Sequence, residues 1–148
     1  MTPTASGPEL PTHAQLPVTA DAVAPDGSLV RLLPSLPAGS MAHFELGADE
    51  VSIPQRHRTV GEIWYVLAGL GMMWRRAATG EVVMVDLRPG TALTIPVGTC
   101  FQFRNTGRVP LEAVGVTMPP WPGEGEAEQV DGPWPPTSRS TQEPGTRP

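Results

Sequence analysis

The stretch IPQRHRTVGEIWYVLAGLG, residues 53–71, decides the fold of this chain. Its second half contains EIWYVL at 62–67, and a run this rich in aromatic and β-branched side chains predicts a strand. The glycines that follow at 69 and 71 predict a turn at the end of that strand. The first half carries Gln55 and His57, and Glu62 begins the strand; imidazole and carboxylate groups are side chains that bind divalent metals or transfer protons.

Short apolar segments bounded by turn residues continue on both sides of this stretch. They are predicted to be strands at 28–33, 41–46, 72–76, 81–87, 91–95, 100–105 and 111–118. Residues 72–76 are expected to pair back on 62–67 as a hairpin. About eight short strands at roughly even spacing, with no helical period, predict an all-β sandwich or barrel.

The proline distribution sets the expected domain limits. Of the 19 prolines, 13 lie before Val30 or after Thr117. Proline removes donors from a sheet, and these flanks are poor in apolar residues, so we expect a disordered lead at 1–25 and a Pro-rich acidic tail at 120–148. One domain is expected between them, at 26–119. The alternative for the tail is partial docking, with Trp121 or Trp134 packing on the barrel or over its mouth.

Charge and cysteine content exclude several classes of function. The net charge is −5, which argues against a nucleic-acid partner. All ten basic residues are arginine, so chemistry through a lysine Schiff base is excluded. The single cysteine rules out an intrachain disulfide. No secretory signal and no apolar run of membrane-spanning length is recognised, so a cytoplasmic protein without membrane contact is expected.

Two motifs make the chain similar to the cupins, a superfamily of small jelly-roll β-barrels. The first is His57, Glu62, the strand Ile63–Leu67 and Gly69. The second is Gly90, then Pro96-Val-Gly98, then Phe103-Arg-Asn105. The likeness covers about residues 26–119 and implies a small single-domain cupin barrel of the bacterial type, or double-stranded β-helix. It also implies a homodimer, because many cupins pair through their sheets.

The resemblance implies a divalent metal site, which this chain retains only in part. In the family, two histidines and a glutamate from the first motif and a third histidine from the second hold iron, manganese, nickel, copper or zinc. Glu62 matches the glutamate, His57 matches the second histidine, and Gln55 falls on the first. The third histidine falls on Phe101, one residue after Cys100. The candidate ligand set is therefore Gln55, His57, Glu62 and Cys100.

Strand alternation leaves two arrangements open for the second motif. If Phe101 faces the interior, Phe103 and Asn105 face it too, and the site keeps no ligand there. If Cys100 faces the interior, a thiolate completes a four-ligand set, and Gln102 and Arg104 follow it unless a bulge intervenes.

The expected pocket is largely aromatic. If Glu62 points inward, alternation places Trp64 beside it, as a flat wall suited to an aromatic ligand. Phe101 and Phe103 are the other candidate wall residues, and His43 is a candidate acid or base in the cavity, with an exposed surface position as its alternative. Arg56 and Arg58 would grip a ligand carboxylate or, more simply, pair with Asp49 or Glu50.

Three functions remain open. The first is an oxygenase, isomerase or cyclase with a reduced metal site, acting on a small organic substrate, for which an aromatic compound is one candidate class. The second is a metal-free cupin in which Glu62 or His57 transfers protons. The third is a non-catalytic module that binds a ligand in the same cavity.

Overall fold

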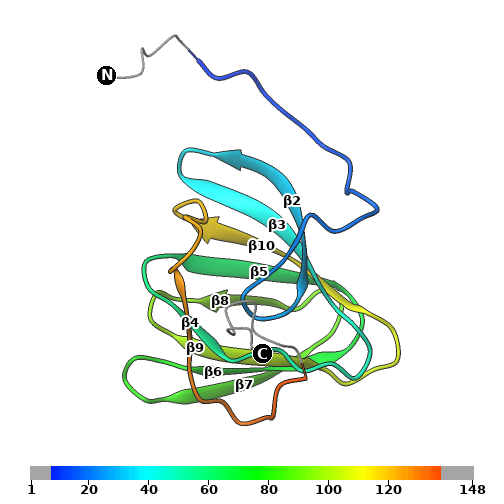
Figure 1. Cartoon of the computed structure of the whole chain (residues 1–148), viewed down its shortest axis with the longest axis vertical. Helices are drawn as coiled ribbons and strands as arrows, with labels where there is room; N and C mark the ends of the chain where they lie inside the picture. Colours follow the sequence, from blue (N-terminus) through cyan, green and yellow to red (C-terminus); the bar gives the residue numbers. More distant parts are fainter. Residues whose placement is uncertain (1–7, 138–148) are drawn as a thin grey trace, which may run out of the picture.

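Eleven strands form two antiparallel sheets in the computed structural model, which describes residues 8–137. The six-stranded sheet has the order β1-β2-β3-β10-β5-β8 and the five-stranded sheet the order β11-β4-β9-β6-β7. Figure 1 shows the two sheets as the upper and lower parts of one barrel. The bounds of the first sheet are β1 Ala22–Val23, β2 Leu29–Leu36, β3 Gly39–Leu46, β5 Gly61–Ala68, β8 Ala92–Ile95 and β10 Leu111–Met118. Those of the second are β4 Gln55–His57, β6 Gly71–Arg76, β7 Val82–Leu87, β9 Cys100–Asn105 and β11 Ala127–Gln129.

Strand β5 has the alternation that the sequence predicts. Glu62, Trp64 and Val66 are buried, whereas the side chains between them, at 63, 65 and 67, are exposed. Successive side chains of a strand point to opposite faces, so one face of β5 enters the core. The core between the sheets is built by such inward faces: Leu46, Trp64, Val66, Met73, Leu87, Leu93, Ile95, Phe101, Phe103, Leu111 and Ala113. The predicted all-β barrel is confirmed.

The predicted hairpin between 62–67 and 72–76 is wrong. Strand β5 pairs with β10 and β8, whereas β6 pairs with β9 and β7 in the other sheet. The turn between them therefore carries the chain across the barrel instead of folding it back. Gly69 makes this crossing with φ 86°, and a Cβ there would lie 2.5 Å from the Pro110 carbonyl oxygen. Local sequence shows a turn but does not show which sheet the next strand joins.

Three short strands were not predicted. β4 contains Gln55 and His57, for which no strand was predicted, and it pairs with β9. β1 pairs with β2, and β11 pairs with β4. β1 and β11 lie outside the predicted domain limits of 26 and 119, and each adds a strand to the edge of one sheet. The disorder predicted for 1–7 and 138–148 falls outside the described residues.

Within residues 8–137, no helix is long and apolar enough to cross a membrane.

Candidate functional site

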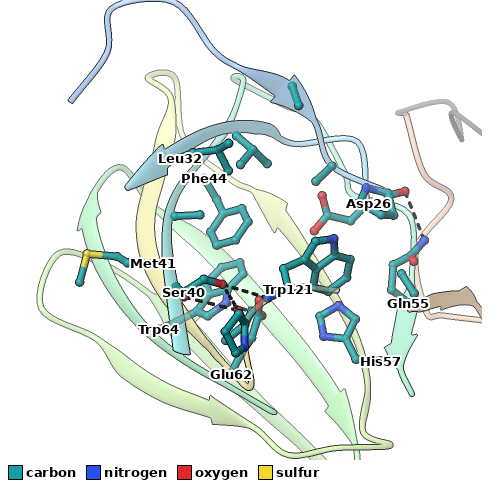
Figure 2. Close-up of a pocket in the computed structure, with 18 of the residues that line it drawn as sticks. Asp26, Leu32, Ser40, Met41, Phe44, Gln55, His57, Glu62, Trp64 and Trp121 are labelled. Carbon is teal, nitrogen blue, oxygen red and sulfur yellow. Dashed lines mark hydrogen bonds between the residues drawn. The ribbon is translucent and has the colours of Figure 1, made fainter. Parts of the chain in front are cut away.

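A cavity of about 500 Å³ opens between the two sheets, next to β1 and β2. Four aromatic side chains contribute to its walls: Phe44, Trp64, Phe101 and Trp121. Phe44 and Trp64 stack with their ring centroids 5.3 Å apart, so this part of the wall is a flat aromatic surface. Figure 2 shows the polar side chains Asp26, Gln55, His57 and Glu62 around the same space.

Glu62 is buried in the cavity wall, with only 5% of its surface exposed. Its Oε1 accepts a hydrogen bond of 2.8 Å from the Trp64 indole N–H. Burial raises the pKa of Glu62 from 4.5 to about 7, because desolvation disfavours the charged form. The Trp64 hydrogen bond opposes this rise, and the neighbouring Asp26 adds to it. The carboxyl group can therefore both hold and release a proton near neutral pH.

Asp26 is a second carboxyl group in the cavity, and it was not among the predicted site residues. Its Oδ1 accepts hydrogen bonds from the Ser28 backbone N–H at 2.9 Å and from the Ser28 hydroxyl at 2.6 Å. Burial raises the pKa of Asp26, and these two hydrogen bonds oppose the rise. The Asp-Gly-Ser sequence at 26–28 signals this turn, because aspartate side chains bond to the backbone two residues on. The sequence gives no sign that the turn lies beside Glu62.

His57 packs between two aromatic rings at the end of β4. The centroid of its ring lies 5.2 Å from that of Phe101 and 4.9 Å from that of Trp121, and both contacts are edge-on. Burial lowers the pKa of His57 to about 4, although the nearby Glu126 carboxylate opposes the shift. The imidazole is therefore neutral at pH 7 and has one N–H to donate. Its Nδ1 is buried without a hydrogen-bond partner among the described residues.

Gln55 lies two residues before His57 and lines the same cavity. Its side-chain nitrogen donates a hydrogen bond of 3.3 Å to the Pro25 carbonyl, and its Oε1 is buried with no partner in the described part of the chain. The structure thus brings together three of the four predicted ligands.

Cys100, the fourth predicted ligand, is not part of the cavity wall. Its sulfur lies 3.6 Å from an Arg76 side-chain nitrogen, in a hydrogen bond, whereas the next residue, Phe101, lines the cavity. The arrangement with Phe101 facing the interior is therefore the one found, and Cys100 points away from the cavity. The reason is packing: the aromatic rings of β9 enter the core, and this fixes the register at the strand end.

The donor set does not fit the four-ligand metal site suggested by the sequence. Among residues 8–137, no three His, Cys, Asp or Glu side chains are grouped so that they could hold a metal ion. The amide oxygen of Gln55 is a weak ligand, and Glu62 already accepts the Trp64 hydrogen bond.

Two predicted pocket residues lie elsewhere. His43 is buried on the other face of β3 from Phe44, where its Nε2 lies 2.9 Å from Glu112 Oε1. The alternative prediction, that His43 is an exposed surface residue, is wrong too, because only 1% of the surface of His43 is exposed. Phe103 packs edge-on against Trp64, with 5.0 Å between ring centroids, and belongs to the core. It supports the Trp64 wall without lining the cavity.

Arg56 and Arg58 pair with the tail, not with Asp49 or Glu50. An Arg56 nitrogen lies 2.6 Å from Glu128 Oε1, and an Arg58 nitrogen lies 2.8 Å from Glu128 Oε2. Neither arginine lines the cavity. Ion pairs in contact with solvent add little to the stability of a fold, so these contacts position the tail more than they stabilise it.

Both tail tryptophans contact the barrel. Trp121 lines the cavity beside His57. Trp134 packs on Arg104, whose guanidinium carbon lies 4.5 Å from the ring centroid, and its backbone N–H donates to Gln102 Oε1 at 3.1 Å. The sequence raised docking of these residues as an alternative but did not say where either would dock.

The fold and this cavity define a small β-barrel protein with a pocket between its sheets, and comparison with known proteins names the class. The Cupin domain family matches residues 42–117, and the chain belongs to this family. Uncharacterized protein MJ1618 of Methanocaldococcus jannaschii is 30% identical over 104 residues, which cover 67% of this chain and 79% of that protein. The resemblance found in the two sequence motifs is therefore confirmed.

Solved structures share the fold at low sequence identity. The capsular polysaccharide assembling protein CapF from Staphylococcus aureus is 15% identical with a TM-score of 0.64, over 78% of this chain and 34% of that one. A recombinant oxalate oxidase in complex with glycolate is 19% identical with a TM-score of 0.62, over 76% and 61%. BH2720 from Bacillus halodurans is 22% identical with a TM-score of 0.57, over 68% and 76%. This chain thus spans about a third of CapF and about three-fifths of the oxalate oxidase, and these likenesses show the fold alone.

Proposed function

We propose that this cupin is a metal-independent enzyme that moves a proton within a small aromatic or polycyclic molecule, as an isomerase does. The observation that carries the proposal is the position of Glu62. Its carboxyl group is buried in the wall of a largely aromatic cavity, and one hydrogen bond, from Trp64, holds it. A group so desolvated ionises near neutral pH, which is where a general acid–base works best.

The walls of the cavity define the class of ligand. The rings of Phe44, Trp64 and Trp121 offer apolar surface for an aromatic or fused-ring skeleton. No arginine is among the described residues that line the cavity, and the chain has no lysine. A carboxylate or phosphate would therefore enter beside Asp26 and Glu62 without a compensating cation. The ligand class is an uncharged molecule with a carbonyl oxygen, in contrast to the oxalate named for the oxalate oxidase.

The proposed reaction is a proton transfer next to that carbonyl. Glu62, as the carboxylate, removes a proton from the carbon beside the carbonyl, and the C–H electron pair moves to form an enolate. The neutral His57 ring donates its N–H to the enolate oxygen. Glu62 then returns the proton to the same or a neighbouring carbon, so the enzyme ends as it began.

A second candidate is a non-catalytic binding module with the same ligand class. The Trp64 hydrogen bond favours it, because that contact gives the Glu62 carboxyl group a structural partner. In this case the carboxyl group holds the indole of the cavity wall in place and takes no part in proton transfer.

Solvent exchange separates the two candidates. The uncharged aromatic ketone 2-tetralone is incubated with the protein in D₂O, and the incorporation of deuterium beside the carbonyl is followed by NMR. We expect the wild type to accelerate exchange and Glu62→Gln to lose about 100-fold or more of that acceleration. Glu124→Gln changes an exposed glutamate and serves as the control. Binding of 2-tetralone without accelerated exchange would refute the enzyme and support the binding module.

A further inference from the structure

Residues 119–137, here called the C-terminal strap, follow β10 and contribute Pro120, Trp121 and Ala127 to the cavity wall. Figure 1 shows this orange segment descending along one side of the molecule, past β4, toward the lower sheet. Within the strap, β11 pairs with β4, which adds a strand to the edge of the five-stranded sheet. The strap is thus part of the wall of the barrel instead of a free tail.

Glu126 anchors the middle of the strap beside the cavity. Its carboxylate accepts three hydrogen bonds, from the Thr59 hydroxyl at 2.6 Å and from the backbone N–H groups of Thr59 and Val60 at 2.7 and 2.9 Å. Burial acts to raise the pKa of Glu126, but these three hydrogen bonds outweigh it, so the pKa is lowered. A charged, fully bonded carboxylate at this point fixes the strap against the loop that follows His57.

Trp121 is the strap residue that projects into the cavity. Its backbone N–H donates a 3.0 Å hydrogen bond to the Ser40 hydroxyl, and its ring packs edge-on against His57. Figure 2 shows its indole in the middle of the group formed by Asp26, Ser40 and His57. The other aromatic wall residues stand on strands of the barrel, whereas Trp121 stands on an irregular segment between prolines at 120 and 122.

We propose that Trp121 is the specificity-determining residue of this cupin and limits the size of the ring system that the cavity accepts. The inference rests on the proposed function only in that it uses the same cavity. The Phe44–Trp64 stack packs into the core, so that wall has little freedom to move. The indole of Trp121 forms a wall of the cavity next to His57, and its removal enlarges the space there without disturbing the core cluster.

Two uncharged fluorescent probes of different size test this role, 2-naphthol with two fused rings and 1-pyrenemethanol with four. Their dissociation constants are measured by fluorescence for the wild type, Trp121→Ala and Trp134→Ala. Trp134→Ala is the matched control, because it removes a strap tryptophan that packs on Arg104 away from the cavity. We expect Trp121→Ala to raise the affinity for 1-pyrenemethanol relative to 2-naphthol by about tenfold or more, and Trp134→Ala to leave this ratio unchanged.

A third variant protects the test against loss of the fold. Trp121→Phe keeps an aromatic ring on the strap and should shift the ratio in the same direction by a smaller factor, and thermal unfolding reports whether each variant is folded. An unchanged ratio in folded Trp121 variants, an equal shift in Trp134→Ala, or no binding of either probe to the wild type would overturn the proposal. Binding affinities require no turnover. If the exchange assay showed no role for Glu62, the proposed enzyme would be refuted, but the affinity ratios measured for the Trp121 variants would still test the proposed role of Trp121.

Discussion

The replacement Glu62→Gln should stabilise the fold at neutral pH while it removes the proposed activity. Glutamine has the same shape and keeps a carbonyl oxygen for the Trp64 indole N–H. It lacks the charge that the apolar cavity disfavours. The gain in stability should therefore depend on pH, and this dependence identifies its cause.

The magnitude follows from the raised pKa of Glu62. In the unfolded chain the group ionises near 4.5, whereas in the folded chain it keeps its proton until about 7. Between these values the folded state binds more protons than the unfolded state, so the wild type loses stability as the pH rises. Each pH unit between them corresponds to 1.36 kcal/mol, and the loss amounts to about 3 kcal/mol in total. Glu62→Gln does not have this loss.

The assay is chemical denaturation of both proteins between pH 4 and pH 8. The free energy of unfolding of Glu62→Gln minus that of the wild type should increase by about 3 kcal/mol across this range. Titrating groups that do not interact with Glu62, such as Glu126, are present in both proteins and cancel in the difference. The control Glu124→Gln should show a difference that does not vary with pH. A flat difference for Glu62→Gln as well would refute the reasoning, because the carboxyl group would then ionise as it does in water.

Three further predictions concern metal, ligand charge and the strap. Protein purified without a tag or chelator should carry far less than one divalent metal per chain by mass spectrometry; near-stoichiometric metal that disappears in His57→Ala would contradict the proposed chemistry. At pH 8, 1-naphthalenemethanol should bind about tenfold or more tightly than 1-naphthoate, because no arginine is among the described residues that line the cavity and the chain has no lysine to meet the carboxylate; equal affinities would show that a cation is supplied from elsewhere. Glu126→Ala should speed hydrogen exchange at the Thr59 and Val60 amides by about tenfold or more, because both amides donate to the Glu126 carboxylate. The control Glu128→Ala should leave these exchange rates unchanged. Amide protection that survives in Glu126→Ala would mean that another group holds the strap.

The fold could be predicted from the sequence because its determinants are local. Strand β5 alternates buried and exposed residues over its length, and a glycine follows its end. The two-residue period and the turn residue therefore both indicate a strand that ends at this point. The same alternation correctly placed Trp64 beside Glu62 on the inner face. The glycine and proline spacing of the two motifs then supplied the family, which local periodicity alone does not distinguish from other β-sandwiches.

The rest of the site depends on contacts between distant segments. The hairpin prediction for β5 and β6 failed because the choice of sheet is made by the whole barrel, not by the turn between the strands. Asp26 lies at the cavity in the turn between β1 and β2, and Trp121 is held there by the hydrogen bond from its backbone N–H to Ser40 on β3. His43 is buried on the outer face by a partner on β10, Glu112, which lies 69 residues away in the sequence. No pattern within a short window contains these relations.

The most direct test of the central claim is the titration of the Glu62 carboxyl group itself. Carbon NMR of protein labelled at the glutamate side-chain carbon, with the Glu62 signal assigned by its absence in Glu62→Gln, follows the ionisation from pH 3 to pH 9. The account predicts a midpoint near pH 7, as the burial of this group in the aromatic cavity requires. A midpoint near pH 4.5 would contradict it, because the carboxyl group would then be an ordinary hydrated side chain, not one poised for proton transfer.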